Sequence, residues 1–358
     1  MKRILLLLIM LAAFLIHRAS AQVVDSALTR YAVKDTQNVN IKLFNRDDLF
    51  QISLRFDITT YKRKRSDTTY LDAVLTYFTD EGDTINKNIR LKARGKIRRT
   101  SAICDFPPLS LNFRMKDTIG GEFIGINKLK VVPYCRIGYE DYVLREYLIY
   151  KLYNALTDYS FRVRLLRITF INTAKNSKPL NQFGFAIEPL KLLEKRTHTS
   201  ESVSKYVTRK TIKPDILDRV SIFNYMIGNT DYSVPALHNV AILSKPFSEN
   251  PEMGIAVPYD FDYAGLVNAE YAVPLEILPI ENVRERLYMG LCRTDDLYKQ
   301  ALQEFLDKKE EFYRIINDFP YLHPRSKKDM INYLEGFYAD FDKRNTIIYK
   351  LGADCKDY

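Results

Sequence analysis

Apolar and polar residues alternate through much of the first half of the chain, and this alternation limits the folds that the chain can adopt. The segments that show it are residues 40–59, 69–79, 87–95, 109–116, 127–134 and 163–172. They are rich in Val, Thr, Tyr and Phe, and turn-forming residues separate them. This composition and period are typical of strands that bury one face. The sequence therefore predicts a sheet-rich first half.

Helical periodicity marks one segment of the first half and most of the second half. Residues 138–156 repeat apolar side chains with a period of about 3.6 residues, and Glu140 and Asp141 suit the positive end of a helix dipole. Further helical patterns lie at residues 216–229, 283–313 and 327–351. Residues 239–245 and 254–262 look like two short strands of a hairpin. We expect an α+β fold with a sheet-rich N-terminal lobe, a mainly helical C-terminal lobe and a site in the cleft between them.

A short apolar run near the N-terminus predicts an export signal. Residues 4–16 are apolar, Lys2 and Arg3 precede them, and Ala19-Ser20-Ala21 has the small-x-small pattern of a cleavage site. A membrane anchor is the alternative, but the run is shorter than the roughly 20 residues that span a bilayer. We expect cleavage after Ala21, a periplasmic or extracellular location, and no stable membrane insertion of the mature chain.

These patterns divide the chain into four parts. The expected signal peptide is residues 1–21, and the polar, aperiodic residues 22–38 form a flexible lead-in. Residues 39–200 form the sheet-rich lobe with one major helix, and residues 201–358 form the mainly helical lobe.

Charge and motif content exclude several classes of protein. The chain has 54 Lys and Arg against 44 Asp and Glu, a mild excess, whereas nucleic-acid binding calls for a stronger basic stripe with interleaved aromatic residues. We therefore expect no nucleic-acid partner. The GxSxG, HExxH, Walker A and Rossmann fingerprints are all absent.

Four cysteines, Cys104, Cys135, Cys292 and Cys355, are compatible with two disulfides or with one disulfide and two buried thiols. Export to an oxidising compartment favours pairing. More than one connectivity is possible, and the sequence leaves the choice open. The spacing lacks the CxxC pattern that is common in zinc sites.

Acidic and amide residues gather around the predicted hairpin. Asp231 follows the helix that ends near Asn229, Asn239 opens the first short strand, and Asp260 and Asp262 close the second. If the strands pair, these side chains converge at one end of the hairpin. Hard oxygen ligands of this kind suit Mg²⁺ or Mn²⁺ together with substrate phosphates, and a separate Asp can accept a hydroxyl proton during phosphoryl transfer.

This arrangement resembles the catalytic segment of the spore-coat CotH kinases and, more distantly, of the HipA kinases. The matching residues are Asn229-Thr230-Asp231, His238-Asn239 and Pro258-Tyr259-Asp260-Phe261-Asp262. The resemblance implies an exported bacterial kinase with a two-lobed protein-kinase-like fold, which uses ATP or another nucleotide. It implies that Asp231 is the catalytic residue and that Asn239 with Asp260 or Asp262 holds metal; it favours Asp260 over Asp262.

The resemblance extends upstream, to span residues 88–265. Its further matches are Arg94-Gly95, residues 109–113, residues 129–132, Leu144-Arg145-Glu146 and residues 183–190. Kinases place a Lys on the nucleotide phosphates and orient it with an acidic residue of a helix, so the resemblance suggests Lys130 with Glu146.

Other residues of this upstream region are further candidates for nucleotide binding. Lys92, Arg94 and Lys96 compete with Lys130 for the phosphates, and the resemblance suggests that Glu188 lines the cleft. The spacing of the catalytic segment also differs from the family, because eight positions separate Asp231 from Asn239, against about five in the kinase pattern. The intervening residues would therefore have to loop out.

We expect an exported phosphotransferase that moves a phosphoryl group from a nucleotide to a hydroxyl of a protein, glycan or small molecule. One alternative is a kinase-shaped binding or structural module of the cell envelope without activity, because nucleotide is scarce outside the cytoplasm. A weaker alternative is a metal-dependent phosphoesterase that uses water as the acceptor.

Overall fold

The computed structural model describes residues 42–113, 121–202, 204, 206–245, 253–342 and 346–356. The chain separates into two compact units, Met1–Asn40 and Ile41–Tyr358, and all of the described residues belong to the second. The predicted signal peptide and lead-in lie outside the described residues. Within the described part, no helix is long and apolar enough to cross a membrane.

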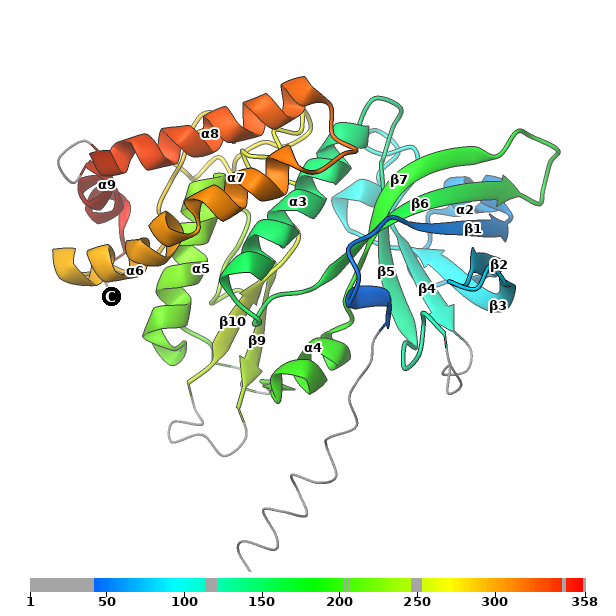
Figure 1. Cartoon of the computed structure of the whole chain (residues 1–358), viewed down its shortest axis with the longest axis horizontal. Coiled ribbons are helices and arrows are strands. Elements are labelled where there is room, and N and C mark those ends of the chain that lie inside the picture. Colours follow the sequence, from blue (N-terminus) through cyan, green and yellow to red (C-terminus); the bar gives the residue numbers. More distant parts are fainter. Residues whose placement is uncertain are drawn as a thin grey trace, which may run out of the picture. The chain divides into compact units, whose positions relative to one another are not determined.

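The strands of the first half close into a barrel in the order β1-β2-β3-β4-β5-β7-β6 (Figure 1). Their bounds are β1 Phe50–Phe56, β2 Leu71–Phe78, β3 Thr84–Ala93, β4 Leu109–Phe113, β5 Lys128–Pro133, β6 Val163–Asn172 and β7 Leu180–Ile187. Neighbouring strands are antiparallel except β1 and β6, which pair in parallel and close the barrel.

The apolar residues that alternate with polar ones in the sequence fill the interior of this barrel. Along β1, Ile52, Leu54 and Phe56 are buried while the residues between them are partly or fully exposed. Equivalent inward positions on β2 and β3 include Leu75 and Leu91, both fully buried. Since a strand turns successive side chains to opposite faces, alternation places the apolar set inside.

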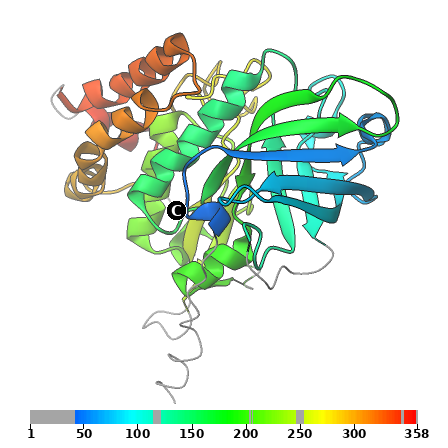
Figure 2. The ribbon, with the colours of Figure 1, turned by 45° about the vertical axis from the view of Figure 1, so that its right-hand side comes forward.

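The helix α3 (Glu140–Leu156) contacts both the barrel and the helical half (Figures 1 and 2). It packs against β7 on one side and against α7 (Lys309–Asn317) on the other. Ten of its residues are buried, and they include charged Arg145 and Glu146. A helix enclosed in this way can carry a charged side chain into the interior only where that charge finds a partner.

The second half is mainly helical. Its helices are α4 (Leu190–Thr197), α5 (Pro214–Ile227), α6 (Asp295–Asp307), α7, α8 (Pro324–Asp342) and α9 (Thr346–Asp354). A small sheet in the order β10-β9-β8 accompanies them; its strands are β8 (Ser200–Glu201), β9 (Val240–Ser244) and β10 (Ile255–Pro258). Short helical segments, η1 (Lys42–Phe44), α2 (Ile58–Lys64), η2 (Ile97–Arg99) and η3 (Arg209–Thr211), complete the fold.

Two of the predicted helices are wrong in their bounds. Residues 283–294 are not helical, because Arg286 donates to the backbone carbonyls of Met226 and Tyr333 and holds this segment across α5 and α8. Residues 327–351 contribute to two helices rather than one, since α8 ends at Asp342 and α9 begins at Thr346.

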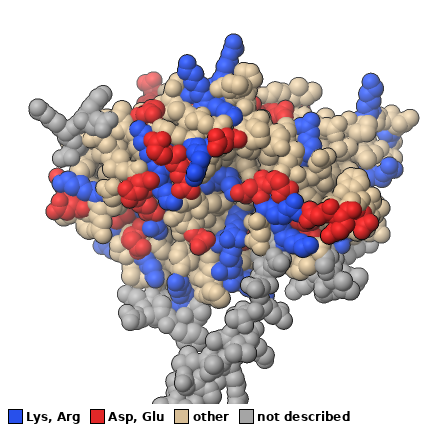
Figure 3. Space-filling model, in the orientation of Figure 1, with Lys and Arg blue, Asp and Glu red and all other residues tan. Residues whose placement is uncertain are grey.

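The predicted α+β arrangement, with a sheet-rich first part and a helical second part, is confirmed. The sequence pattern did not predict that the sheet would close. A closed barrel does not clearly match the two-lobed kinase arrangement that the resemblance implies. On the face seen in Figure 3, basic and acidic side chains are intermingled rather than sorted by sign.

The four cysteines form two disulfides. Cys104 bonds to Cys135, and Cys292 bonds to Cys355. The structure thus selects one of the connectivities that the sequence left open. Two disulfides fit an oxidising compartment of the kind that exported proteins occupy.

Candidate functional site

The hairpin of β9 and β10 brings Asn239 next to Asp260. Val240 pairs with Pro258 in antiparallel register, and the Tyr259 N–H donates to the Asn239 carbonyl at 2.9 Å. Asn239 and Asp260 both have positive φ, 51° and 63°. This left-handed region is unfavourable for most residues with a side chain and often occurs at functional sites. The Asp260 N–H also donates to the Tyr150 hydroxyl at 2.8 Å, which fixes the backbone there.

The end of α5 positions Asp231. The helix stops at Gly228, whose φ is 67°, and a Cβ atom at this position would lie 2.0 Å from the Tyr333 hydroxyl oxygen. Only glycine fits both the conformation and the space. The next residue, Asn229, accepts the Asp231 N–H at 3.1 Å and donates to the Asn224 side chain at 2.8 Å. Asp231 thus leaves the helix on a short, hydrogen-bonded turn.

Residues 233–238 loop out as a tight turn, which accommodates the long spacing between Asp231 and Asn239. The Ser233 N–H donates to the His238 carbonyl at 2.9 Å, and the His238 N–H returns the bond to Ser233 at 3.0 Å. The chain therefore comes back to its starting point. His238 Nε2 then lies 2.8 Å from one Asp231 carboxylate oxygen, and Asn239 Nδ2 donates to the other at 3.0 Å.

The surroundings of Asp231 raise its pKa. Burial is the main cause, and the negative charge of Asp260 adds to it, while the contacts with His238 and Asn239 act in the opposite direction. A carboxylate with a raised pKa is a better proton acceptor at neutral pH than an ordinary surface Asp. The Asp231 side chain remains 29% exposed, so it is open to solvent.

Three carboxylates from distant parts of the chain form a compact cluster, called here the carboxylate triad. Glu146 comes from α3, and Asp260 and Asp262 follow β10; one oxygen of each lies within 4.8 Å of the others. Glu146 and Asp262 are buried, whereas the Asp260 side chain is one third exposed. Oxygen ligands at this separation suit a hard divalent cation.

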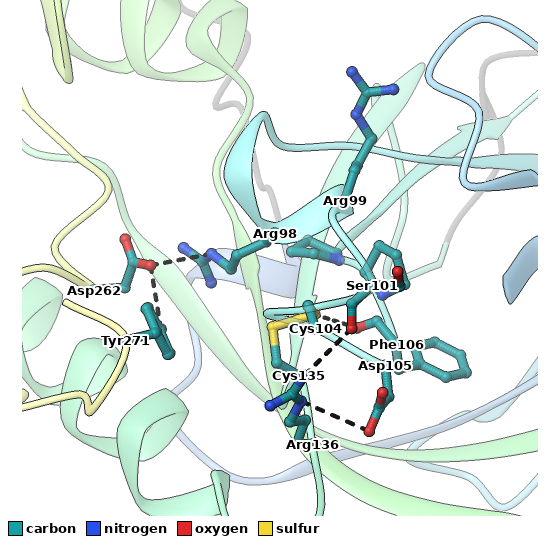
Figure 4. Close-up of a disulfide and its surroundings, with 12 residues drawn as sticks. Arg98, Arg99, Ser101, Cys104, Asp105, Phe106, Cys135, Arg136, Asp262 and Tyr271 are labelled. Carbon is teal, nitrogen blue, oxygen red and sulfur yellow. Dashed lines mark hydrogen bonds and ion pairs between the residues drawn. A yellow bond between two sulfur atoms is a disulfide. The ribbon is translucent and has the colours of Figure 1, made fainter.

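Arg98 lies within the carboxylate triad. Its Nε is 3.1 Å from Asp262, its Nη2 is 2.8 Å from Asp260, and its Nη1 is 3.5 Å from Glu146. Figure 4 shows Arg98 directed at Asp262, whose carboxylate also accepts a hydrogen bond from the Tyr271 hydroxyl. Burial raises the pKa of Glu146 and of Asp262, and the guanidinium of Arg98 opposes this rise.

A pocket of about 460 Å³ borders this region. Its apolar wall includes Phe161 and Ile242, and Lys130 and Lys128 lie at its polar side. Tyr259, the residue before Asp260, lines it as well. Its volume lies in the range of about 300–1,000 Å³ that is typical of small-molecule sites. The pocket could therefore take an aromatic ring against the apolar wall and anionic groups toward the lysines.

Lys130 lies at this pocket and not against Glu146. Its Nζ is 5.4 Å from the centre of the Tyr259 ring. Although the side chain is exposed, the surrounding protein atoms and the charge of Arg94 lower the pKa of Lys130. The suggested pairing with Glu146 is wrong, because Glu146 faces Arg98 instead.

Lys92 is engaged elsewhere. It lies two strands from Lys130 in the barrel, since Lys92 pairs with Ser110 and Ser110 pairs with Lys130. Its Nζ donates to the Asp67 carbonyl at 2.5 Å and lies over the Tyr70 ring.

Glu188 is a structural anchor at the pocket wall. It is buried and forms an ion pair of 2.9 Å with Arg196 of α4, and it accepts the Arg162 N–H at 3.0 Å. These contacts tie β7 to α4 and to the start of β6. Its carboxylate oxygens are both used by the protein, so it shapes the pocket rather than offering a free ligand atom.

Sequence reasoning missed Arg98 and Tyr271. Arg98 lies in a basic stretch, residues 91–99, but nothing in the sequence of that stretch distinguishes the side chain that turns inward. Figure 4 shows neighbouring Arg99 pointing away from Asp262, and it pairs with Asp67 instead. The side chains of Arg98 and Arg99 point in different directions because both lie in the short turn η2. Neither a strand period nor a helix period in the sequence predicts such a turn.

Comparison with known proteins gives little beyond this geometry. No family model matches the chain, and no curated protein matches it. Among solved structures, the chain is similar to the proinflammatory kinase CtkA of Helicobacter pylori, with 13% identity and a TM-score of 0.38 over 73% of this chain and 95% of that one. Because this TM-score is low, we draw no conclusion from the likeness and rely on the residues of this chain.

Proposed function

We propose that the protein is an exported kinase-like phosphotransferase that moves the terminal phosphoryl group of ATP to a hydroxyl acceptor with the help of Mg²⁺ or Mn²⁺. One observation carries the proposal: Asp231 with Asn239, and the carboxylate triad, meet beside a pocket that also presents Lys130. In this proposal the barrel and the helical half act as the two lobes, because the pocket takes residues from both.

Asp231 is the proposed base. It accepts the proton of the acceptor hydroxyl while the new bond forms between the acceptor oxygen and phosphorus, and the bond from phosphorus to the bridging oxygen breaks to release ADP. His238 and Asn239 hold the two carboxylate oxygens of Asp231 in a fixed direction. The raised pKa of Asp231 supports this role.

The carboxylate triad is the proposed metal site, with Asp260 and Asp262 as the main ligands and Asn239 next to them. The donor set fits a hard cation, since all of its atoms are oxygens. Glu146 Oε1 is buried and has no hydrogen-bond partner among the described residues, so the cluster has ligand capacity that the protein leaves unused. A divalent ion bound there would neutralise charge on the transferring phosphates.

Lys130 is the proposed phosphate contact, with Arg94 beside it, and the apolar wall of the pocket is the proposed seat of the nucleotide base. Lys128, on the same strand, adds positive charge at the polar side. Glu188 supports the wall. The acceptor, whether a protein, a glycan or a small molecule, would approach Asp231 from the solvent side.

A thermal-shift assay tests the proposal. The mature, disulfide-bonded chain is heated with and without ATP, in the presence of Mg²⁺ or Mn²⁺, beside Asp260→Ala. We expect a rise in melting temperature that requires both metal and nucleotide and that Asp260→Ala abolishes. The matched control is Asp296→Ala, which removes an exposed carboxylate of α6. Absence of any shift in the unchanged protein would overturn the proposal.

One observation favours the second candidate, an envelope module with a kinase shape and no activity. Arg98 already occupies the carboxylate triad and supplies a positive charge there. Product analysis then separates the candidates: phosphate on an added acceptor supports the transferase, free phosphate supports the phosphoesterase, and unchanged ATP supports the inactive module.

A further inference from the structure

The guanidinium of Arg98 and a divalent cation cannot occupy the carboxylate triad together. Each of the Arg98 nitrogens Nε, Nη2 and Nη1 faces a different carboxylate, at 3.1, 2.8 and 3.5 Å. The three ligand oxygens lie within 4.8 Å of one another, which leaves space for one cationic centre. A metal ion would need those oxygens at about 2.1 Å for Mg²⁺, so the guanidinium would have to leave.

Arg98 does not fully satisfy the triad. It brings one positive charge to three carboxylates, and Glu146 Oε1 stays buried without a hydrogen-bond partner among the described residues. A buried carboxylate oxygen without a partner is costly. This orphaned oxygen, on the carboxylate whose other oxygen faces Arg98, indicates that the site can hold a cation of higher charge than Arg98 provides.

The turn that carries Arg98 is fastened on its C-terminal side. Arg65 donates to the Cys104 carbonyl at 2.6 Å, Arg136 donates to the Ser101 carbonyl at 3.2 Å, and the Cys104–Cys135 disulfide joins the segment to the end of β5 (Figure 4). On its N-terminal side lies Gly95, with φ of 90°, where an added Cβ would meet only the Arg98 Cβ, at 3.7 Å. The C-terminal end of the turn is therefore held by a covalent bond, whereas its N-terminal end rests on a glycine whose carbonyl accepts a hydrogen bond from Arg99 Nε at 2.6 Å.

We propose, on the premise that the carboxylate triad is the metal site of the proposed function, that Arg98 is an internal cation that competes with the divalent metal for this site. The described arrangement is the resting state, from which Arg98 excludes the metal. Loading requires the Arg98 side chain to leave the triad, with movement of the turn at Gly95, and the Cys104–Cys135 disulfide strengthens the hold of Arg98 on the carboxylates. The phosphates of a bound nucleotide are the natural destination of the released guanidinium.

Mn²⁺ binding without nucleotide tests this proposal. The mature chain is titrated with Mn²⁺, and free Mn²⁺ is measured by electron paramagnetic resonance. We expect weak binding by the unchanged protein and binding at least tenfold tighter by Arg98→Gln. The matched control is Arg55→Gln, which removes an exposed guanidinium of β1 that belongs neither to the turn nor to the triad, and it should bind like the unchanged protein. Adding Asp262→Asn to Arg98→Gln should abolish the gain.

A second variant still tests the proposal if Arg98→Gln does not fold. Cys104→Ser with Cys135→Ser leaves Arg98 and all three carboxylates in place but releases the fastened end of the turn, and it should bind Mn²⁺ more tightly than the unchanged protein. The proposal is overturned if Arg98→Gln and the unchanged protein bind Mn²⁺ equally, if neither binds it, or, where Arg98→Gln does not fold, if the paired cysteine variant shows no gain.

The outcome is separable from that of the proposed function. If the unchanged protein shows the metal-dependent ATP shift while Arg98→Gln gains no affinity for Mn²⁺, the phosphotransferase stands and the role of Arg98 falls. If Arg98→Gln gains affinity but no form of the protein responds to ATP, the competition at the triad stands and the phosphotransferase falls.

Discussion

Asp231 and Asn239 are eight positions apart in the chain, yet the Asn239 side-chain amide donates to both the backbone carbonyl and the carboxylate of Asp231, at 2.8 and 3.0 Å. The turn of residues 233–238 makes this contact possible. The backbone carbonyl of Asn239 in turn accepts a hydrogen bond from the N–H of Tyr259, the residue before Asp260. A proposed base and a proposed metal ligand are thus joined through one asparagine.

Replacement of the proposed base tests its role directly. Asp231→Asn keeps the size of the side chain and one accepting oxygen but removes the carboxylate that would take the proton. We expect phosphotransfer to fall by roughly 10²- to 10⁴-fold, with nucleotide affinity retained, as measured by product formation and by ATP titration. His238→Gln, which removes only an orienting contact, should cost less. Full activity in Asp231→Asn would contradict the assignment.

Lys130 and Lys92 can be distinguished by nucleotide affinity. Lys130→Met should weaken ATP binding by roughly 10- to 100-fold, because a charge-assisted hydrogen bond contributes about 1.5–3 kcal/mol. Lys92→Met should bind ATP like the unchanged protein, because that side chain serves the Asp67 carbonyl and the Tyr70 ring. Calorimetric titration measures both, and equal losses would refute the distinction.

Gly228 is expected to be the least replaceable residue at the end of α5. Gly228→Ala forces a side chain into the left-handed region and against Tyr333, at a cost of about 2–4 kcal/mol in the free energy of unfolding. Tyr333→Phe in the same chain should recover part of it, because it removes the closest atom. Gly352→Ala in α9, where no atom lies within 4 Å of the added Cβ, is the control and should be neutral or stabilising.

The second disulfide should matter for stability but not for the metal site. Cys292 and Cys355 are 63 positions apart, so replacing both with Ser should lower the free energy of unfolding by roughly 2–5 kcal/mol. Denaturant titration measures this loss. The Cys292 and Cys355 variant should keep the Mn²⁺ affinity of the unchanged protein, whereas the Cys104 and Cys135 variant should gain affinity. A gain in the Cys292 and Cys355 variant as well would contradict a specific effect of the first disulfide on Arg98.

Glu122 should make stability depend on pH. Burial is the main cause that raises the pKa of Glu122 above the ordinary 4.5, and the negative charge of Asp80 adds to it. The positive charges of Arg164, Arg46 and Lys42 act in the opposite direction. Because the folded state holds the proton of Glu122 more tightly than the unfolded state does, this group stabilises the folded state below pH 4.5. That stabilisation is lost as the pH rises through the raised pKa of the folded state.

Glu122→Gln tests this dependence. At neutral pH it should raise the melting temperature, since it removes a buried charge with one oxygen that has no hydrogen-bond partner among the described residues. The gain should shrink as the pH falls toward the ordinary value, where the carboxyl of the unchanged protein is protonated in both states. A gain of equal size at all pH values would point to packing rather than charge.

Much of the secondary structure could be predicted, because it depends on residues close in the chain. The alternation in residues 109–113 and the periodicity of residues 138–156 correspond to β4 and α3. The exceptions have tertiary causes. Residues 283–294 look helical, but side chains such as Arg286 bind to distant backbone carbonyls and hold an irregular path.

The sequence by itself determined most strands of the barrel other than β7, the helices α3 and α5, the hairpin of β9 and β10, and the approach of Asn239 to Asp260 at its end. These follow from periodicity, turn residues and chain order, which act over short distances. The tertiary structure alone decided that the sheet closes into a barrel, which cysteines pair, and that Glu146 meets Arg98 rather than Lys130. The reason is physical: buried charges are placed wherever packing brings an opposite charge close enough to compensate desolvation, and that choice depends on residues far apart in the chain.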